Sequence, residues 1–519
     1  MFTTIRKRDG REVPYDIAKI TGAIEKAMAA CGRTDLHKSA DLAQEVEGRL
    51  VQKYGTESPD IEAIQDCAES VLMDKGYPVV AKRYIHYRDD RSRSREKNTP
   101  LMHALHELTV KDAAGSNMKR DNANIDGDTA MGVMLKYGSE SAKDYYKKFI
   151  LSQQQSDAHQ SGDIHIHDFD FYALTTTCCQ IDVLKLFDGG FSTGHGHLRE
   201  PNSIHSYAAL ACIAIQSNQN DQHGGQSIPN FDFGLAPGVR KTYKKIYILN
   251  FIKGLRLLAP ESGLSDDDVK DVFKGLAQSD HYTPRLRMNG EYKAAETRAF
   301  TEATDGAVSE DALGRVHDFA VQAAENETER ETLQAMEALV HNLNTMHSRA
   351  GAQTPFSSIN YGTDTSPEGQ LVTKCVMLAT ESGLGGGETA IFPIHIFKVK
   401  EGVNYNEGDP NYDLFKLACR VSAKRLFPNF AFIDAPFNLR YYREGHPETE
   451  VAYMGCRTRV LGNTYDKENE VAFGRGNLSF TSINLPRIAI SSGGNLEWFF
   501  GELERKLDFV TSQLLDRYR

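Results

Sequence analysis

The stretch Tyr453-Met454-Gly455-Cys456-Arg457-Thr458-Arg459-Val460 places one cysteine between a glycine and an arginine, with strand-forming residues on both sides. This pattern predicts two short strands joined by a tight loop that carries the sulfur at its tip. A buried structural cysteine is the more common interpretation of such a residue. Because the chemistry of a thiol, more than its packing, decides its use, Cys456 is nevertheless a candidate functional residue.

The composition indicates a multidomain globular protein of 519 residues. Its 60 basic and 71 acidic residues give a formal net charge of −11, which excludes a general attraction to nucleic acid or anionic membranes. No apolar run suits a membrane span or a signal peptide, so the predicted location is the cytoplasm. The eight cysteines form no Cys-x-x-Cys pair, which predicts reduced thiols and no cysteine zinc site within these residues.

The first hundred residues follow the pattern of a small separate domain. Asp9-Gly10 lies between two strand-like runs and predicts a β-hairpin. Four helices are expected next, over residues 17–28, 39–54, 60–75 and 79–88. The charged run 88–98 suits a helix end and linker. We therefore expect a hairpin plus a four-helix cluster over residues 1–98 and a second domain over residues 99–519.

Strand-like and helical stretches alternate in the second domain. Strands are expected within 164–171, 175–183, 393–398, 429–433, 449–454 and 479–490, and helices over 142–160, 239–258, 309–345, 366–380, 412–426 and 503–519. This alternation predicts an α/β domain with buried strands.

Cations gather around the predicted hairpin. Lys7, Arg8, Asp9 and Gly10 form its turn, and Lys19 and Lys26 lie on the helix that follows. Point charges with accessible backbone N–H groups suit a triphosphate. Taken alone, the cluster is more simply explained as a solvated basic face.

Two histidines, His165 and His167, lie on one face of a predicted strand. Such spacing occurs in metal-dependent hydrolases, which makes metal-assisted hydrolysis a rival hypothesis. The later histidines lie in glycine- and asparagine-rich loops without a ligand pattern, which favours hydrogen-bonding histidines instead.

The adjacent Cys178 and Cys179 end a β-branched run. Successive strand residues face opposite sides, so only one of these sulfurs can face a barrel interior. A disulfide between neighbours would be strained, and Cys456 is the natural partner for the inward sulfur.

Two further segments suit a phosphorylated or polyhydroxylated ligand. The first is glycine-rich and includes Gly385, Gly386 and Gly387, whose N–H groups could cradle phosphates, although a flexible turn is as common an explanation. The second runs over 348–362, where Ser357, Ser358 and Asn360 are expected to offer donors on a rigid turn.

Several motifs in order carry a family resemblance. Residues 3–95, with Lys-Arg-Asp-Gly-x-x-x-Pro-Tyr-Asp and the later Ala81-Lys82-Arg83-Tyr84, closely resemble the ATP-cone, a regulatory nucleotide sensor. Ile-His-Asp, Thr-Thr-Cys-Cys-Gln-Ile-Asp, Arg-Ala-Gly-x-Gln-x-Pro-Phe, Met-Gly-Cys-Arg and Arg-Gly-Asn-Leu follow. Together they resemble the anaerobic (class III) ribonucleoside-triphosphate reductases. The resemblance implies a ten-stranded α/β barrel with a central finger loop that carries Cys456.

The resemblance also implies roles for individual residues. Cys456 would form a thiyl radical that abstracts the 3′ hydrogen of the ribose, and Cys178, with Cys179 as the fallback, would supply a proton and hydrogen. Aerobic reductases carry a carboxylate where this chain has Thr458, and a second redox thiol is absent near Asn477. Both features are typical of the formate-using branch, so formate is the expected reductant.

Regulation and partners are likewise implied. ATP or dATP with Mg²⁺ would bind the cone through Lys7, Arg8, Asp9, Gly10, Lys19, Lys26 and Lys82. A deoxynucleoside triphosphate would bind a specificity site near residues 122–127, at a dimer interface. The implied partners are ribonucleoside triphosphates, a radical-SAM activating enzyme and a second copy of the chain, with a dATP-dependent higher oligomer as a further state.

Two family features do not occur in these 519 residues. The glycyl radical loop, Arg-Val-x-Gly-Tyr, and a four-cysteine zinc site are both missing. We expect them in a C-terminal region beyond these residues, and a protein ending at Arg519 would bind nucleotides without turnover. The alternatives are a catalytically silent nucleotide-binding regulator and a glycyl radical enzyme of the pyruvate formate-lyase type.

Overall fold

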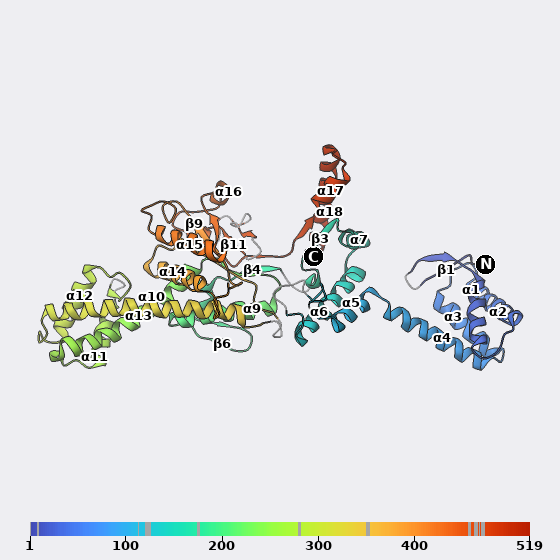
Figure 1. Ribbon diagram of the computed structural model, residues 1–519, viewed down its shortest axis with the longest axis horizontal. Coiled ribbons are helices and arrows are strands. Elements are labelled where there is room, and N and C mark those ends of the chain that lie inside the picture. Colours follow the sequence, from blue (N-terminus) through green and yellow to red (C-terminus); the bar gives the residue numbers. More distant parts are fainter. Residues whose placement is uncertain are drawn as a thin grey trace. The chain divides into compact units, whose positions relative to one another are not determined.

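A computed structural model describes residues 2–7, 10–112, 114–119, 126–173, 177–278, 282–348, 353–454, 458–460, 466, 468 and 473–519. The chain divides into two compact units, Met1–Val110 and Lys111–Arg519 (Figure 1). The first unit includes helix α5 (Pro100–Val110), which lies beyond the boundary predicted at residue 98.

The first unit is a β-hairpin with a helical cluster, as predicted. Strands β1 (Thr4–Arg6) and β2 (Glu12–Pro14) pair antiparallel, with Thr4 opposite Pro14. The helices are α1 (Ile17–Ala29), α2 (Leu36–Tyr54), α3 (Ile61–Asp74) and α4 (Pro78–Lys97). Their apolar faces meet in one core around Ile24, Val46 and Val71.

Two helix boundaries in this unit differ from the prediction. Helix α2 begins at Leu36 because the Asp35 side chain accepts the N–H of Lys38 and caps it. Helix α4 continues to Lys97, so the charged run is helical and not a linker. Arginine, lysine and glutamate are good helix formers. Arg88 also ties α4 to α3 through ion pairs of 2.7–2.8 Å with acidic side chains there: Glu62, Asp66 and Glu69.

The second unit is built on a six-stranded sheet of order β10-β9-β8-β7-β4-β13. Its strands are β4 (Cys178–Gln180), β7 (Gln226–Ile228), β8 (Ser357–Tyr361), β9 (Ile394–Val399), β10 (Asn429–Phe432) and β13 (Gly476–Asn477). The first five are parallel and β13 is antiparallel to β4. The α/β class is therefore confirmed, while the count of ten strands stays a prediction.

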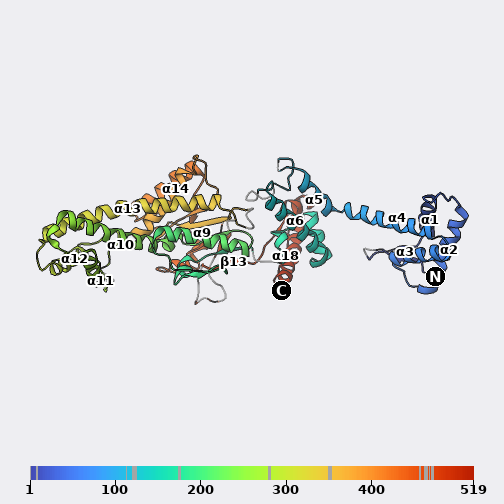
Figure 2. The same cartoon turned by 90° about the horizontal axis from the view of Figure 1, so that it is seen from below.

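Helices cover one face of this sheet (Figure 2). They are α9 (Ile204–Asp221), α10 (Phe231–Leu258), α13 (Glu310–Thr345), α14 (Pro367–Ser382) and α15 (Tyr412–Arg425). Ile228, Ile359, Tyr361 and Phe397 point into the core that these helices form with the sheet. Since strand residues alternate, the intervening residues line the opposite face, called here the inner face.

Helices α10 and α13 run side by side in both views and extend well past the sheet (Figures 1 and 2). Helices α11 (Asp266–Leu276) and α12 (Gly290–Ala303) pack at their far end. A second apolar core lies here, with Phe251, Phe273 and Phe300 at its centre. This helical extension holds no candidate site residue from the sequence.

A further group of elements precedes and follows the sheet in sequence. It contains α6 (Ala130–Tyr145), a π-helical turn (Tyr146–Ile150), α7 (Gln153–Ser161), β3 (Ile164–Ile166), β14 (Thr481–Ile483), α17 (Leu485–Ser491) and α18 (Leu496–Tyr518). The prediction of a single helix over 142–160 is wrong, because Ser152 caps the start of a separate helix, α7, through a capping box with Gln155. The strand expected over 479–490 ends at Ile483, where the Asn484 side chain caps α17.

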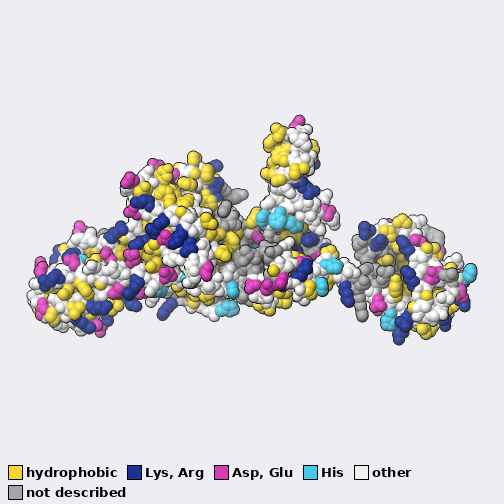
Figure 3. Space-filling view, viewed as in Figure 1, with side chains coloured by type: hydrophobic (Ala, Val, Ile, Leu, Met, Phe, Trp, Pro, Cys, Tyr) yellow, Lys and Arg dark blue, Asp and Glu magenta, His cyan; other side chains and the backbone are white. Residues whose placement is uncertain are grey.

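The C-terminal helices expose apolar side chains (Figure 3). Ile490, Leu496 and Phe500 are each at least 60% exposed. Nothing in the structure shows what covers this surface. Within the described ranges, no helix has both the length and the apolar content needed to cross a membrane.

The remaining short elements join these larger ones. They are α8 (Val183–Phe187), β5 (Phe191–Ser192), β6 (His197–Leu198), α16 (Pro436–Leu439), β11 (Ala452–Tyr453) and β12 (Arg459–Val460). The last two carry the stretch with which the sequence analysis began.

Candidate active site

The Cys456 stretch is the end of a β-hairpin. Ala452 pairs with Val460 and Tyr453 with Arg459, and the Met454 N–H donates to the Thr458 carbonyl at 3.0 Å. The two short strands predicted on either side of the Cys456 loop are therefore present. Cys456 itself, within residues 455–457, lies outside the described residues.

Asn360 fastens this hairpin to the inner face of the sheet. Its Oδ1 accepts the Tyr453 N–H and its Nδ2 donates to the Tyr453 carbonyl, both at 2.9 Å. The Ser227 hydroxyl donates to the same carbonyl at 2.9 Å. A fully buried amide that pairs with both backbone groups of one residue holds the hairpin in a defined position.

The two adjacent cysteines face opposite sides of the sheet. Cys178 is 2% exposed and packs on the inner face against Met454 and Val460, which flank the hairpin end. The Gly225 N–H donates to its sulfur at 3.3 Å. Gly224 has φ 82°, and a Cβ there would lie 2.9 Å from the same sulfur, so this close approach requires glycine.

Cys179 faces the helices on the other side. Its sulfur accepts from the Asn218 amide at 2.9 Å and donates to Gln226 Oε1 at 3.1 Å. Burial raises the pKa of the Cys179 thiol to about 11, against the opposing effect of the Asn218 hydrogen bond. The structure therefore brings Cys178, and not Cys179, to the hairpin that carries Cys456.

Asn477 and Thr458 complete the group around Cys178. In the antiparallel pairing of β13 with β4, Asn477 lies opposite Cys178 and Gly476 opposite Cys179. The Asn477 amide donates to the Thr458 hydroxyl at 3.2 Å. Cys178, Asn477, Thr458 and the base of the hairpin thus meet on one face, where Cys178 is buried and the other two side chains are half-buried.

The sequence analysis expected a rigid turn at Ser357, Ser358 and Asn360. The structure instead places these residues on the central strand β8. Pairing with β7 on one side and β9 on the other overrides the weak strand preference of serine. Ser358 and Asn360 face inward and Ser357 faces the helices. All three side chains are fully buried, and Asn360 is committed to the hairpin.

The glycine-rich segment is an exposed turn before β9. The Gly386 N–H donates to the Glu388 carboxylate at 2.9 Å, and the Gly387 N–H to the Leu384 carbonyl at 2.6 Å. Gly385 and its two successors are exposed. These N–H groups already have acceptors, and the proposed phosphate cradle stays a prediction.

The cone residues lie on the surface of the first unit. Lys19 and Lys26 are exposed on α1, two helical turns apart, and Lys82 is exposed on α4, which packs against α1. Lys7 and Gly10 flank the hairpin turn, where the Gly10 N–H donates to the Lys7 carbonyl at 2.9 Å. Arg8 and Asp9 lie outside the described residues.

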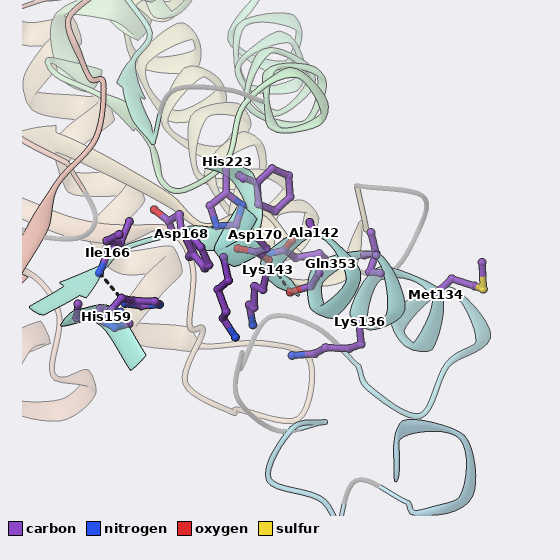
Figure 4. A pocket seen from close by; sticks show the side chains of 17 residues that line it. Met134, Lys136, Ala142, Lys143, His159, Ile166, Asp168, Asp170, His223 and Gln353 are labelled. Atoms are coloured by element: carbon purple, nitrogen blue, oxygen red, sulfur yellow. Dashed lines mark hydrogen bonds and ion pairs between the residues drawn. The ribbon is translucent and has the colours of Figure 1, made fainter. Parts of the chain in front are cut away.

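The histidine strand borders a separate pocket of about 640 Å³ (Figure 4). Lys136 and Lys143 of α6 line it together with His165 and Asp168. Burial alone would raise the pKa of Asp168, but the hydrogen bond of 2.9 Å from His223 and the charges of His223, His167 and Arg517 together lower it. His167 of the histidine strand bonds to the Ser482 hydroxyl at 2.8 Å. No cluster of three metal-ligating side chains occurs in the described part of the chain.

The expected specificity site lies partly beyond what the structure describes. Residues 122–125 of that segment are outside the described residues, whereas Asp126 and Gly127 lead into α6. Because α6 lines the pocket of Figure 4, the segment and this pocket adjoin in sequence.

The sequence analysis missed three polar residues near the site: Gln180, Ser227 and Arg475. Gln180 is two residues beyond Cys178 and hence on the same face, while Ser227 and Ser358 continue the same row across β7 and β8. Alternation along the cysteine strand could have identified Gln180. No local signal identifies the other two, because they arrive through long-range pairing.

Comparisons with known proteins agree with this arrangement. The family described as "Anaerobic ribonucleoside-triphosphate reductase" matches residues 121–519, and "ATP cone domain" matches residues 3–93. The anaerobic ribonucleoside-triphosphate reductase of Haemophilus influenzae is 28% identical over 514 residues, covering 98% of this chain and 62% of that protein. The Salmonella typhimurium protein of the same name is 29% identical, covering 100% and 62%.

Similarity to solved structures is weaker. An anaerobic ribonucleotide reductase superposes with a TM-score of 0.48 at 12% identity, covering 91% of this chain and 59% of that chain. The chain spans about three fifths of the length of the curated relatives it matches. On the family match over most of its length, the chain belongs to the anaerobic ribonucleoside-triphosphate reductase family and carries an ATP cone domain.

Proposed function

We propose that this protein is an anaerobic ribonucleoside-triphosphate reductase that uses formate to convert ribonucleoside triphosphates to 2′-deoxyribonucleoside triphosphates. The observation that carries the proposal is the buried group formed by Cys178, Asn477 and the hairpin of Cys456. The overall reaction would consume the nucleotide, formate and a proton, and would yield the deoxynucleotide, carbon dioxide and water.

The residues have distinct proposed roles. Cys456, as a thiyl radical, abstracts the 3′ hydrogen of the ribose, a feasible step because S–H and activated C–H bonds are similar in strength. Cys178 protonates the leaving 2′-hydroxyl, takes a proton back from the medium and then gives a hydrogen atom to the radical intermediate. Oxidation of formate to carbon dioxide supplies the two electrons that restore the Cys178 thiol and complete the reduction of the ribose. Its place against both flanks of the hairpin end supports this role, whereas the outward direction of Cys179 counts against the fallback.

The identities of Asn477 and Thr458 explain why the reaction would need an external reductant. Neither side chain is a base or a redox thiol, so the site needs a small molecule that supplies both functions. Formate does this when it is oxidised to carbon dioxide. Asn477 would orient it, because its amide points toward Thr458 on the same face as Cys178. Ser358 and the glycines at 385–387 remain proposed contacts for the nucleotide.

Nucleotide effectors would control the activity. The match to the ATP cone domain supports binding of ATP or dATP with Mg²⁺ in the first unit, where ATP activates and dATP inhibits. The cationic pocket of α6 (Figure 4) is a candidate place for the second effector, because Lys136, Lys143 and Lys147 line it.

Further components belong to the proposal. A glycyl radical would generate the thiyl radical, and a structural zinc belongs to the same proposal. A radical-SAM enzyme would activate the protein, which would act as a homodimer in the cytoplasm. The proposal involves neither nucleic acid nor membrane as a partner.

Equilibrium binding tests the proposal against a silent regulator. Labelled CTP should bind the chain at saturating ATP, at a site that the Lys19→Ala and Lys26→Ala substitutions do not affect. Binding of ATP and dATP without any ribonucleotide at a second site would favour the regulator instead.

A further inference from the structure

The inner face next to Cys178 contains buried polar atoms without partners among the described residues. Both amide atoms of Gln180 and the Ser358 hydroxyl are in this state, although the two side chains are only 4% and 0% exposed. One guanidinium nitrogen of Arg475, Nη1, is buried and unpartnered as well. Such groups are costly unless a ligand or water satisfies them.

Strand pairing brings Gln180 and Arg475 together. The Gln180 N–H donates to the Arg475 carbonyl at 2.7 Å, one residue along from the pairing of Gly476 with Cys179. Side chains two residues apart on a strand share a face, so Gln180 lies beside Cys178 and Arg475 beside Asn477. The four side chains form two neighbouring cross-strand pairs on the inner face.

The donors of this cluster select an anion. A guanidinium carries a fixed positive charge and offers planar N–H groups that match carboxylate geometry. The Gln180 amide adds a neutral donor beside it. Neighbouring same-face positions on a strand are about 6.6 Å apart, so an ion held here would lie within reach of both Asn477 and Cys178. This spacing suits a one-carbon carboxylate better than a triphosphate chain.

We propose that Gln180 and Arg475 form the binding site for the carboxylate group of the reductant, formate. This inference rests on the proposed function and names its reductant subsite. In this arrangement Arg475 supplies the charge, Gln180 the second donor, and Asn477 the contact on the side of Cys178. The two unpartnered donors, Arg475 Nη1 and Gln180 Nε2, would then both donate to one carboxylate.

Formate binding by the 519-residue chain tests the proposal. Transverse relaxation of isotopically labelled formate would be followed by NMR as protein is added, for the wild type, Arg475→Met and Gln180→Met. Both substitutions keep an unbranched stem of similar length and remove the polar head. We expect formate affinity to fall about 10- to 100-fold in Arg475→Met and several-fold in Gln180→Met.

A control substitution on the opposite face of the sheet checks that the effect is specific to the inner face. Gln226 is also fully buried, on the strand next to β4, but its Oε1 pairs with Cys179 on the helix side. Gln226→Met should therefore leave formate affinity unchanged. Unchanged affinity in Arg475→Met with a native melting temperature would overturn the proposal. If Arg475→Met fails to fold, unchanged affinity in Gln180→Met overturns it equally.

Competition with inorganic tripolyphosphate shows whether the cluster binds a carboxylate or the phosphates of the nucleotide. If tripolyphosphate displaces formate and itself binds more weakly to Arg475→Met, the cluster belongs to the nucleotide phosphates and the proposal is wrong. In turnover assays of the natural protein, Arg475→Met should raise KM for formate and leave KM for CTP unchanged. Formate binding without any turnover would keep this subsite while refuting the reductase function, so the two failures are distinguishable.

Discussion

Asn477 lies opposite Cys178 across the pairing of β13 with β4, and its amide donates to the Thr458 hydroxyl at 3.2 Å. Three side chains separated by up to 299 positions thereby share one partly buried face with the hairpin of Cys456. The distance between Cys178 and this hairpin is fixed by the amide of Asn360 as well. The central residues of the proposed chemistry are therefore held by backbone pairing and by one buried asparagine.

The two neighbouring cysteines should differ sharply in function. Cys178→Ser should reduce turnover of the activated protein by about 10³-fold or more, because serine cannot donate hydrogen to a carbon radical. Cys179→Ser is the matched control. Its turnover should stay within about threefold of that of the wild type, since the Cys179 sulfur faces the helices. Equal loss in both variants would contradict the assignment of Cys178.

Asn360 should prove to be a positioning residue. Asn360→Ala leaves the Tyr453 N–H without its buried partner and removes one of the two donors to the Tyr453 carbonyl, so the free energy of unfolding should fall by about 2 kcal/mol or more. Ser357→Ala on the same strand should have little effect, because its buried hydroxyl has no partner in the described structure. Urea unfolding measures both, and equal stability of the two variants would argue against an anchoring role.

The exposed lysines of α1 should govern effector binding. Lys19→Ala and Lys26→Ala should each weaken ATP and dATP binding about tenfold, with a smaller dependence on salt than the wild type. Lys38, which pairs with Asp35 on α2, provides a control of the same charge. Calorimetric titration at two salt concentrations checks this expectation, and an equal effect of Lys38→Ala would point to general electrostatics.

His395 should make stability depend on pH. Burial lowers its pKa to about 3, while both ring nitrogens bond to hydroxyls, those of Tyr361 and Thr380. The unfolded state takes up a proton near pH 6.5 and the folded state does not. The stabilisation is therefore complete above pH 6.5 and is lost as the pH falls, by up to about 1.4 kcal/mol per pH unit.

Comparison of variants isolates this contribution. Asp232 acts in the opposite direction, because burial, followed by the charge of Asp364, raises its pKa to about 6. His395→Gln should flatten the fall in unfolding free energy between pH 6.5 and 5 relative to the wild type. An unaltered slope in His395→Gln would contradict a neutral buried imidazole.

Local patterns predicted most of the helices and the N-terminal hairpin. Asp9-Gly10 and the Asp16 cap are signals carried by adjacent residues, and the structure confirms both elements. The helix expected at 309–345 was found at Glu310–Thr345, where the Ser309 side chain caps its start. Such features depend on neighbours within a few positions, so the sequence alone contains them.

The inner face of the sheet could not be predicted in this way. Strand β7 and strand β8 are rich in serine and glutamine, and only pairing with distant strands makes them strands. The alternation of side chains along a strand predicted that Cys178 and Cys179 face opposite sides. Which of the two faces the hairpin depends on how β4 pairs with its neighbouring strands. Arg475 reaches Gln180 only through the antiparallel pairing of β13, which no local signal in the sequence specifies.

Formate-dependent turnover of the natural protein, activated under anoxic conditions, tests the central claim most directly. Labelled formate should yield labelled carbon dioxide in equal amount to the dCTP formed from CTP. Asn477→Ala should abolish both products, whereas Asn220→Ala, on the exposed side of α9, should retain them. Formation of dCTP at an unchanged rate in Asn477→Ala, or without any oxidation of formate, would contradict the account.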